Sequence, residues 1–177
     1  MGSIIVYIAA SLDGYIARPD DDISWLDPFS AGDEDYGYAG FMKTIGTVIM
    51  GSRTWEQNLL HPERHLSGVK NYVLAREPIA RVPGIEAEAW HGSPASLAER
   101  IRKESDKDIY LAGGGQVISR FLSEGLVDEI RLFIVPFLLG EGIPLFTGIR
   151  GNIRLELVNT VPYPGGIAEL RYRPVRS

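Results

Sequence analysis

The stretch of sequence that decides the fold is Asp108-Ile109-Tyr110-Leu111-Ala112-Gly113-Gly114-Gly115-Gln116-Val117-Ile118-Ser119-Arg120-Phe121-Leu122. An apolar run stops at three consecutive glycines, and apolar residues then recur from Val117 at helical spacing, which predicts a strand, a tight turn and a helix. Glycines at such a junction permit positive φ and carry no Cβ, so a ligand can lie against the backbone. Because the first N–H groups of a helix are free to bind an anion, the stretch predicts a phosphate-binding turn.

The three glycines also have a purely structural interpretation. The dinucleotide-binding fingerprint requires a further glycine where Ile118 stands, and the stretch lacks the lysine and following Ser or Thr of a P-loop. Glycines can equally let a helix pack close to a sheet. The rest of the chain has to decide between the two interpretations.

The composition is that of one globular domain. The chain has 177 residues, 45% of them hydrophobic and 23% charged, so we expect a single domain over residues 1–177. A net charge of −5 without a Lys/Arg run argues against nucleic acid or an anionic membrane as the main partner. The lack of cysteine excludes disulfides and suits a reducing cytoplasm. Residues 4–10 are apolar but too short for a membrane or signal segment, so a cytoplasmic protein is expected.

The first strand is expected over residues 3–10 and to be buried on both faces. The turn at residues 11–14 ends it and places Asp13 at the carboxyl end of a strand, where open α/β sheets bind ligands. The alternative is that Asp13 only closes the turn. The following loop carries the apolar residues Trp25, Leu26 and Phe29, which predicts a flap packed over a site or over the core.

A second junction of the same kind follows a predicted helix at 33–44 and a strand at 47–50. Gly51 ends that strand, and Ser52, Arg53 and Thr54 start the next helix, where hydroxyls, a guanidinium and backbone N–H groups can meet one phosphate. A further strand ends at Arg76, which is either a cation for another phosphate or a solvated surface charge.

The remaining elements set the fold class. A short edge strand is expected at 85–90, a helix at 93–103 with Pro94 at its first position, and a long apolar strand at 129–139. Residues 154–161 and 167–173 alternate as an antiparallel hairpin. Because strands and helices alternate before a tail of strands only, the chain predicts an α/β protein with a mixed, mostly parallel central sheet flanked by helices and a C-terminal antiparallel hairpin.

Four motifs in this order resemble the dihydrofolate reductase superfamily over nearly the whole chain. They are Ser11-Leu12-Asp13-Gly14, Val48-Ile49-Met50-Gly51-Ser52-Arg53-Thr54-Trp55-Glu56, Leu111-Ala112-Gly113-Gly114-Gly115, and Val127-Asp128-Glu129-Ile130 leading to Leu138-Leu139-Gly140-Glu141-Gly142. Within the superfamily the chain is most similar to the reductase domain of bifunctional riboflavin biosynthesis proteins and its small stand-alone relatives. The resemblance implies the dihydrofolate reductase-like fold.

The resemblance also implies an NADPH site across the ends of the parallel strands. The matching positions are Ala10, Gly51, Ser52, Arg53, Thr54, Leu74, Ala75, Arg76, Gly113, Gly114, Gly115, Gln116, Val117 and Ile118. In the family pattern the residues from Gly51 to Thr54 hold the phosphates, those ending at Arg76 border the adenosine and its 2′-phosphate, and Ala10 approaches the nicotinamide carboxamide. The family often has a cis peptide between the first two glycines of the central turn.

On the substrate side of the expected site, the sequence departs from the pattern of the folate-reducing members. Those proteins place a carboxylate about one turn before the aromatic residue that matches Phe41, where this chain has Gly37. Asp35, two residues away, would serve only after a shift of register. The riboflavin branch places the Asp13 turn near the reactive face. The compensating proton is therefore expected to come from Asp13 or from water, and Asp13 would need a pKa raised by burial to donate it.

Tyr7, Asp13, Trp25 and Tyr36 are therefore the expected substrate-side residues. The activity implied is hydride transfer from NADPH to a small nitrogen heterocycle or its ribosylamino derivative, as in 5-amino-6-(5-phosphoribosylamino)uracil reductase of riboflavin biosynthesis. Dihydrofolate (pterin) reduction is the alternative within enzymes. A non-catalytic nucleotide-binding or assembly protein on the same fold is the alternative outside them.

Two further expectations concern partners. No metal site is expected, because His61 and His65 are separated by Pro62 and lack the Glu of a zinc-protease motif. A homodimer through the C-terminal strands is expected, because the long apolar strand of residues 129–146 could pair across a two-fold axis.

Overall fold

The structure, a computed structural model, describes residues 1–30, 32–61 and 67–176. Its strands are β1 (Ile4–Ser11), β2 (Tyr15–Ala17), β3 (Ile45–Gly51), β4 (Lys70–Leu74), β5 (Ala87–Trp90), β6 (Asp108–Gly113), β7 (Glu129–Val135), β8 (Ile143–Pro144), β9 (Leu155–Pro162) and β10 (Ala168–Pro174). Its helices are α1 (Asp27–Ser30), α2 (Tyr38–Thr44), α3 (Ser52–Leu59), α4 (Pro94–Glu104) and α5 (Gly115–Ser123), with 3-10 turns η1 (Ser24–Leu26) and η2 (Pro164–Gly166).

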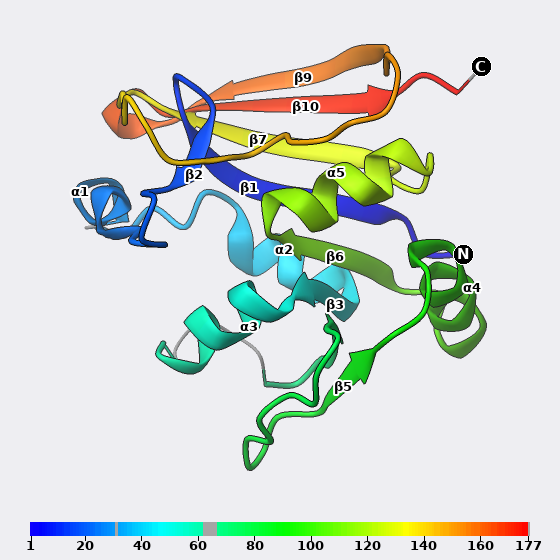
Figure 1. The fold of residues 1–177 in the computed structure, drawn as a ribbon. Helices are drawn as coiled ribbons and strands as arrows, with labels where there is room; N and C mark the ends of the chain where they lie inside the picture. The colour runs from blue at the N-terminus through cyan, green and yellow to red at the C-terminus, as the bar shows by residue number, and fades with distance from the viewer. Residues whose placement is uncertain (31, 62–66, 177) are drawn as a thin grey trace.

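Eight strands form one mixed sheet in the order β5-β4-β3-β6-β1-β7-β10-β9, and β2 pairs with β8 in a separate ribbon. The pairs from β5 to β7 are parallel, whereas β10 is antiparallel to both β7 and β9. Figure 1 shows the C-terminal pair at one end of the sheet and β5 at the other. The predicted α/β class, with its mostly parallel sheet and antiparallel hairpin, is therefore confirmed.

The core lies on both faces of the sheet because successive side chains of a strand point to opposite faces. On one face, Ile49 of β3 packs with residues of α4 and α5 such as Ile101 and Phe121. On the other face, Val48 and Met50 pack with residues from α2 and α3. A third cluster joins β7 to the loop after β2 and includes Trp25, Phe133 and Val135.

The helix predicted over residues 33–44 is α2, and it starts later than the apolar spacing predicts. It begins at Tyr38 rather than near Asp33, because Tyr36 and Gly37 have φ of 55° and 77°, which no α-helix accommodates. The Asp35 carboxylate accepts hydrogen bonds from the N–H groups of Gly37 and Ala39 at 2.9 and 3.0 Å. Residues 33–37 thus form a capping turn before the helix.

The long strand predicted over 129–139 is β7, which ends at Val135 before Pro136. It lies between β1 and β10 and is hydrogen-bonded to both. Pairing of this strand with a second copy was a wrong expectation, because its two edges are already used. The free edge at this end of the sheet belongs to β9. No helix in the described part of the chain is long and apolar enough to cross a membrane.

Candidate functional site

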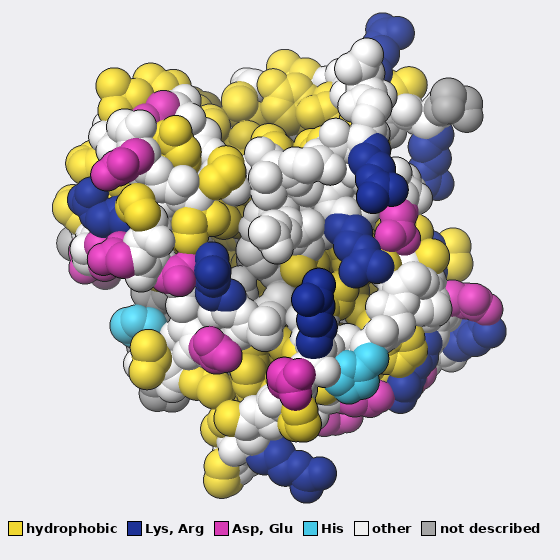
Figure 2. All heavy atoms as spheres, in the orientation of Figure 1, with side chains coloured by type: hydrophobic (Ala, Val, Ile, Leu, Met, Phe, Trp, Pro, Cys, Tyr) yellow, Lys and Arg dark blue, Asp and Glu magenta, His cyan; other side chains and the backbone are white. Residues whose placement is uncertain are grey.

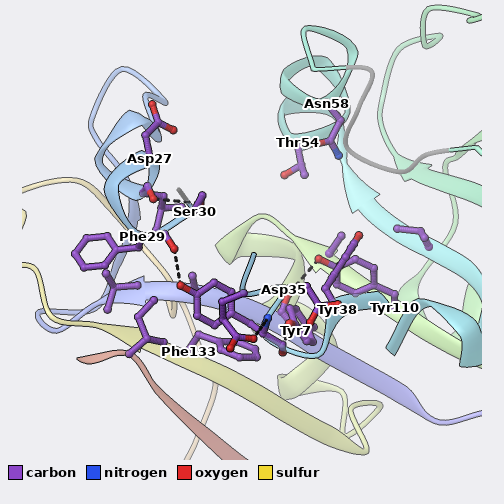
Figure 3. A pocket seen from close by; sticks show the side chains of 18 of the residues that line it. Tyr7, Asp27, Phe29, Ser30, Asp35, Tyr38, Thr54, Asn58, Tyr110 and Phe133 are labelled. Carbon is purple, nitrogen blue, oxygen red and sulfur yellow. Dashed lines mark hydrogen bonds between the residues drawn. The ribbon is translucent and has the colours of Figure 1, made fainter. Parts of the chain in front are cut away.

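A hollow with aromatic walls opens over the carboxyl half of the central strands, on the face that carries α2. We call it the aromatic hollow; its volume is about 750 Å³. Its aromatic lining consists of Tyr7, Phe29, Tyr36, Tyr38, Tyr110 and Phe133. Its polar lining consists of Asp27, Ser30, Glu34, Asp35, Thr54 and Asn58. Figure 3 shows Phe29 and Ser30 on one side, Thr54 and Asn58 facing them from α3, and the tyrosines along the floor.

The floor is built from three tyrosines that come from three distant segments. Tyr7 stands on β1, Tyr110 on β6 and Tyr38 on α2, and the ring centroids of Tyr7 and Tyr38 are 5.5 Å apart. The Tyr110 hydroxyl donates a 3.1 Å hydrogen bond to the main-chain oxygen of Tyr7. Burial raises the pKa of all three phenols, so they stay uncharged at neutral pH. The floor is therefore an aromatic surface whose phenol groups carry no charge.

The wall opposite α3 is held by hydrogen bonds from the hydroxyl groups of Tyr7 and Tyr36. The Tyr7 hydroxyl donates to the main-chain oxygen of Tyr36 at 2.8 Å. The Tyr36 hydroxyl in turn donates to the main-chain oxygen of Phe29. Phe133 packs edge-on against Tyr36 with centroids 6.3 Å apart. The segment from α1 to α2 is therefore tied to the sheet at the place where it covers the hollow.

A second hollow lies at the carboxyl ends of β3, β4 and β5, beside the start of α5. We call it the arginine hollow, because Arg76 and Arg120 line it; its volume is about 970 Å³. His91 also lines it and has Nδ1 2.8 Å from the main-chain oxygen of Ala75. Figure 2 shows basic side chains in a column on this face of the molecule, with a histidine beside it. Two guanidinium groups beside a helix start suit an anionic ligand.

The two hollows adjoin at the glycine junctions. A Cβ on Gly114 would lie 3.6 Å from Oγ1 of Thr54, which lines the aromatic hollow. A Cβ on Gly51 would lie 3.1 Å from Cγ2 of Val117, which lines the arginine hollow. The peptide between Gly113 and Gly114 is cis, as the family resemblance implies. Thr54 of the aromatic hollow and Val117 of the arginine hollow therefore pack against neighbouring glycines, so the two hollows lie close together at these junctions.

Most of the expected cofactor positions meet at this place. Ser52, Leu74, Ala75, Arg76, Gln116 and Val117 line the arginine hollow. Gly51, Gly113 and Gly114 form the glycine junctions, Gly115 packs against the main chain of Pro144 and Leu145, and Thr54 faces the aromatic hollow.

Three of the expected cofactor residues have their side chains outside the lining of both hollows. Arg53 is exposed and pairs with Asp21, with Nε and Oδ2 3.5 Å apart. Ala10 and Ile118 have their side chains buried in the core, so only their main chain remains to contact a ligand.

Asp13 does not have the environment expected of a proton donor. Its side chain is exposed and accepts hydrogen bonds from Ser11 Oγ at 2.6 Å and from the N–H groups of Leu139 and Gly140 at 3.2 and 2.8 Å. The Ser11 hydroxyl and these N–H groups hold the pKa of Asp13 below its usual value. The expectation of a pKa raised by burial was wrong, because these donors stabilise the charged form.

Tyr7 and Tyr36 line the aromatic hollow as expected. Trp25 does not belong to this lining; it is buried behind it, against Phe133 and Ile167. Sequence reasoning missed Tyr38 and Tyr110. The signal for Tyr110 was present in the sequence. Tyr110 precedes the glycines in a strand whose alternate residues are buried in the core, so its side chain points to the other face of the sheet.

No group of three or more acidic or histidine side chains in the described ranges could hold a metal ion. His65, of the histidine pair considered above, lies outside the described residues.

Comparison with known proteins supports the resemblance over the whole chain. The uncharacterized Bacillus subtilis protein YwjB is 35% identical over 169 residues, which cover 95% of each chain. The riboflavin biosynthesis protein RibD of Corynebacterium ammoniagenes is 25% identical over 84% of this chain but only 48% of its own length. The chain thus spans about half of that protein.

Solved structures show the same architecture. A candidate riboflavin biosynthesis protein from Shewanella sp. PV-4 superposes with a TM-score of 0.86 at 26% identity, covering 98% of this chain and 99% of its own. Dihydrofolate reductase from Enterococcus faecalis, solved with NADP(H), gives a TM-score of 0.68 at 18% identity, covering 98% of this chain and 96% of its own. The mixed sheet and its bare glycine junction therefore define a domain of the dihydrofolate reductase-like fold. Residues 90–168 match the RibD C-terminal domain, and the chain belongs to this family.

Proposed function

We propose that the protein is an NADPH-dependent reductase of a small nitrogen heterocycle or its ribosylamino derivative. The observation that carries the proposal is the meeting of the two hollows at the glycine junctions. One hollow has arginines and helix starts, which suit phosphates, and the other has neutral aromatic faces, which suit flat rings. A dinucleotide that spans the junction would bring its nicotinamide against a ring held in the aromatic hollow.

The residues present fit such a cofactor. Arg76 and Arg120 line the arginine hollow and would pair with phosphate groups, including a 2′-phosphate. The N–H groups at the start of α5 would face the pyrophosphate where Gly113 and Gly114 leave the backbone bare. The buried Nε1 of Trp55, which also lines this hollow, has no hydrogen-bond partner among the described residues.

In the reaction the protein would mainly position the substrate and the cofactor and shield them from water. The bound cofactor would supply the hydride to a C=N or C=O carbon of the substrate. Tyr7, Tyr38 and Tyr110 would hold the ring flat, and the wall that carries Tyr36 would limit the access of water. The Asp35 carboxylate lines the hollow, but two N–H donors lower its pKa, so the compensating proton would come from water.

The proposal that the substrate resembles that of the uracil reductase of riboflavin biosynthesis is supported by the similarity to related proteins. The family is that of the RibD C-terminal domain. One structure of the same fold, at 18% identity, is a deaminase/5-amino-6-(5-phosphoribosylamino)uracil reductase from Thermotoga maritima. Reduction of a pterin is the second candidate, and it is favoured by the presence of a carboxylate, Asp35, in the aromatic hollow.

We further propose a cytoplasmic homodimer that forms through the C-terminal strands. The strand β9 is an edge of the sheet, and it exposes Leu155, Leu157 and Val158 by 39%, 53% and 44%. An exposed apolar edge strand is a ready surface for pairing with a second copy. Light scattering should give a dimer mass at micromolar concentration, and Leu157→Lys should give a monomer.

Titration with NADPH and NADH, followed by tryptophan fluorescence, tests the cofactor. Micromolar binding with a preference for NADPH is expected, and Trp90→Phe should lose part of the quenching because Trp90 lines the arginine hollow. Arg76→Ala should weaken NADPH about tenfold and leave NADH unchanged. Arg81→Ala, an exposed arginine outside the lining of this hollow, is the matched control. A folded protein that binds neither nucleotide would overturn the proposal and favour a role in assembly.

A further inference from the structure

We propose that the aromatic hollow selects an unphosphorylated heterocycle, uncharged or cationic, and rejects the phosphorylated ribosylamino-pyrimidine on which the named uracil reductases act. The inference rests on the proposed function and narrows its substrate class. The hollow itself, with its aromatic floor, is the binding site; the charges around it decide which ligand enters.

All the charged side chains in the described lining of this hollow are acidic. They are Asp27, Glu34 and Asp35, and no Lys, Arg or His stands with them among the described lining residues. The Asp35 charge is fixed in place, because its two oxygens accept hydrogen bonds from main-chain N–H groups at 2.9 and 3.0 Å. Glu34 accepts from the N–H of Tyr36 at 2.8 Å. A phosphate in this hollow would meet carboxylates and find no cation among these residues.

A neighbouring hollow on the side of Phe29 and Tyr36 is acidic as well. A smaller hollow of about 390 Å³, the rim hollow, shares Phe29, Glu34 and Tyr36 with the aromatic hollow. It adds Asp33, and its described lining again contains no basic side chain. A tail that leaves the aromatic hollow on this side would therefore pass Glu34 and one further carboxylate, that of Asp33.

The basic side chains behind the wall are already neutralised. Arg171 pairs with the buried Glu169 at 2.6 Å. Arg131 stacks on the ring of Phe41 at 5.3 Å and pairs with Glu129 at 2.8 Å. Both guanidinium groups are paired with carboxylates, and neither residue belongs to the described lining.

The contrast with the arginine hollow supports the assignment. That hollow has Arg76 and Arg120 among its lining together with Glu56 and Glu77, and Arg120 also pairs with Glu124 at 3.6 Å, so its charge is mixed and not acidic alone. In the aromatic hollow the chain presents neutral phenol rings and carboxylates. Rings with amino or amidine groups donate hydrogen bonds to carboxylates, and flat cations bind well to aromatic faces.

The experiment compares two ligands that differ only in the phosphate. 5-Amino-6-(5-phosphoribosylamino)uracil and its dephosphorylated ribosylamino counterpart are titrated into the protein by calorimetry and assayed with NADPH. The dephosphorylated compound should bind and turn over about tenfold better or more. Added salt should strengthen binding of the phosphorylated compound only, because screening reduces repulsion.

A double variant tests the origin of the selectivity. Asp33→Asn with Glu34→Gln removes two charges and keeps an oxygen that can accept from the Tyr36 N–H. The preference for the dephosphorylated compound should fall about threefold or more. The control is Asp106→Asn, a side chain 94% exposed that pairs with the N-terminus outside these hollows, and it should leave the preference unchanged.

The outcomes distinguish the proposal that the protein is a reductase from the proposal that the aromatic hollow rejects a phosphorylated substrate. Equal or better use of the phosphorylated compound by a protein that oxidises NADPH would overturn the substrate class and leave the reductase standing. A preference that the double variant does not reduce would overturn the role of the carboxylates. If NADPH does not bind, the reductase proposal fails, and the calorimetric preference between the two compounds still decides whether the hollow excludes phosphate.

Discussion

The hydroxyl of Tyr7 donates a hydrogen bond of 2.8 Å to the main-chain oxygen of Tyr36. Tyr7 stands on the central strand β1, and Tyr36 lies in the capping turn before α2, 29 residues away in sequence. Tyr163 adds a longer bond of 3.3 Å to the same oxygen. The position of the covering segment thus depends on a side chain that also lines the floor of the aromatic hollow.

Tyr7→Phe should loosen this segment without disturbing the cofactor end. Loss of one such hydrogen bond costs about 1 kcal/mol of unfolding free energy. We expect a several-fold higher KM for the heterocycle and an unchanged Kd for NADPH, measured by steady-state assay and by fluorescence. Tyr172→Phe is the control, because Tyr172 packs against the core on the opposite face of the sheet. Equal effects on substrate and cofactor would contradict a local role for Tyr7.

Gly115, the first residue of α5, leaves no room for a side chain. A Cβ there would lie 2.4 and 2.7 Å from the main-chain oxygens of Pro144 and Leu145. Gly115→Ala should therefore lower the unfolding free energy by about 2 kcal/mol or more, because the clash is with backbone. Gly40→Ala, within α2 and with nothing within 4 Å of its Cβ, should raise it by about 0.5–1 kcal/mol. Urea denaturation measures both, and a neutral Gly115→Ala would show that β8 can move away.

Asp13 should contribute to stability in a pH-dependent way. Its pKa in the folded protein is lowered, by the Ser11 hydroxyl and by main-chain N–H groups of the 139–140 turn. A lowered pKa means that the contribution is present above the unfolded-state pKa and is lost as pH falls through the folded value. Asp13→Asn should have a lower Tm than the original protein at pH 7, and the difference between the two Tm values should disappear in acid. Turnover per folded molecule should stay unchanged. A Tm difference that persists at low pH would contradict the linkage, and a loss of turnover would restore Asp13 to the mechanism.

The parts of this fold that were predictable follow from local rules. The helix at α4 was marked by Ser93, whose side chain accepts from the Ser96 N–H, and by Pro94. The two glycine junctions were marked by apolar runs that stop at glycine. The start of α2 was missed because apolar spacing does not reveal the positive φ of Tyr36, whose main-chain oxygen accepts a hydrogen bond from the distant Tyr7.

The aromatic floor was harder to predict because it is a product of strand order. Tyr7 and Tyr110 are 103 residues apart in sequence, and they meet because β1 and β6 are neighbours in the sheet. Strand order depends on long-range pairing, which no local pattern encodes. The same reason explains why the strand β7 was expected to pair with a second copy and instead lies between β1 and β10.

The ion pair between Arg171 and Glu169 gives a last prediction, on stability. Glu169 is only 1% exposed and accepts from Arg171 Nε at 2.6 Å and Nη2 at 3.2 Å, and Tyr163 donates to it at 3.3 Å. Arg171→Met would leave a buried carboxylate without its cation, which costs about 3–5 kcal/mol when the geometry cannot relax. Arg173→Met is the matched control two residues along β10, because Arg173 is 61% exposed and its contact with Glu129 is 3.5 Å long; it should cost less than about 1 kcal/mol.

The double variant Arg171→Met with Glu169→Leu separates the two possible origins of that loss. If the cost comes from an uncompensated buried charge, removal of the carboxylate should recover most of it, because a buried pair replaced by apolar residues is often neutral. If the cost comes from displaced packing around Tyr163, which contacts Tyr36 with ring centroids 5.2 Å apart, the double variant should stay as unstable as Arg171→Met. Urea denaturation of the four proteins decides, and in the second case the KM for the heterocycle should rise together with the instability, because Tyr36 lines the aromatic hollow.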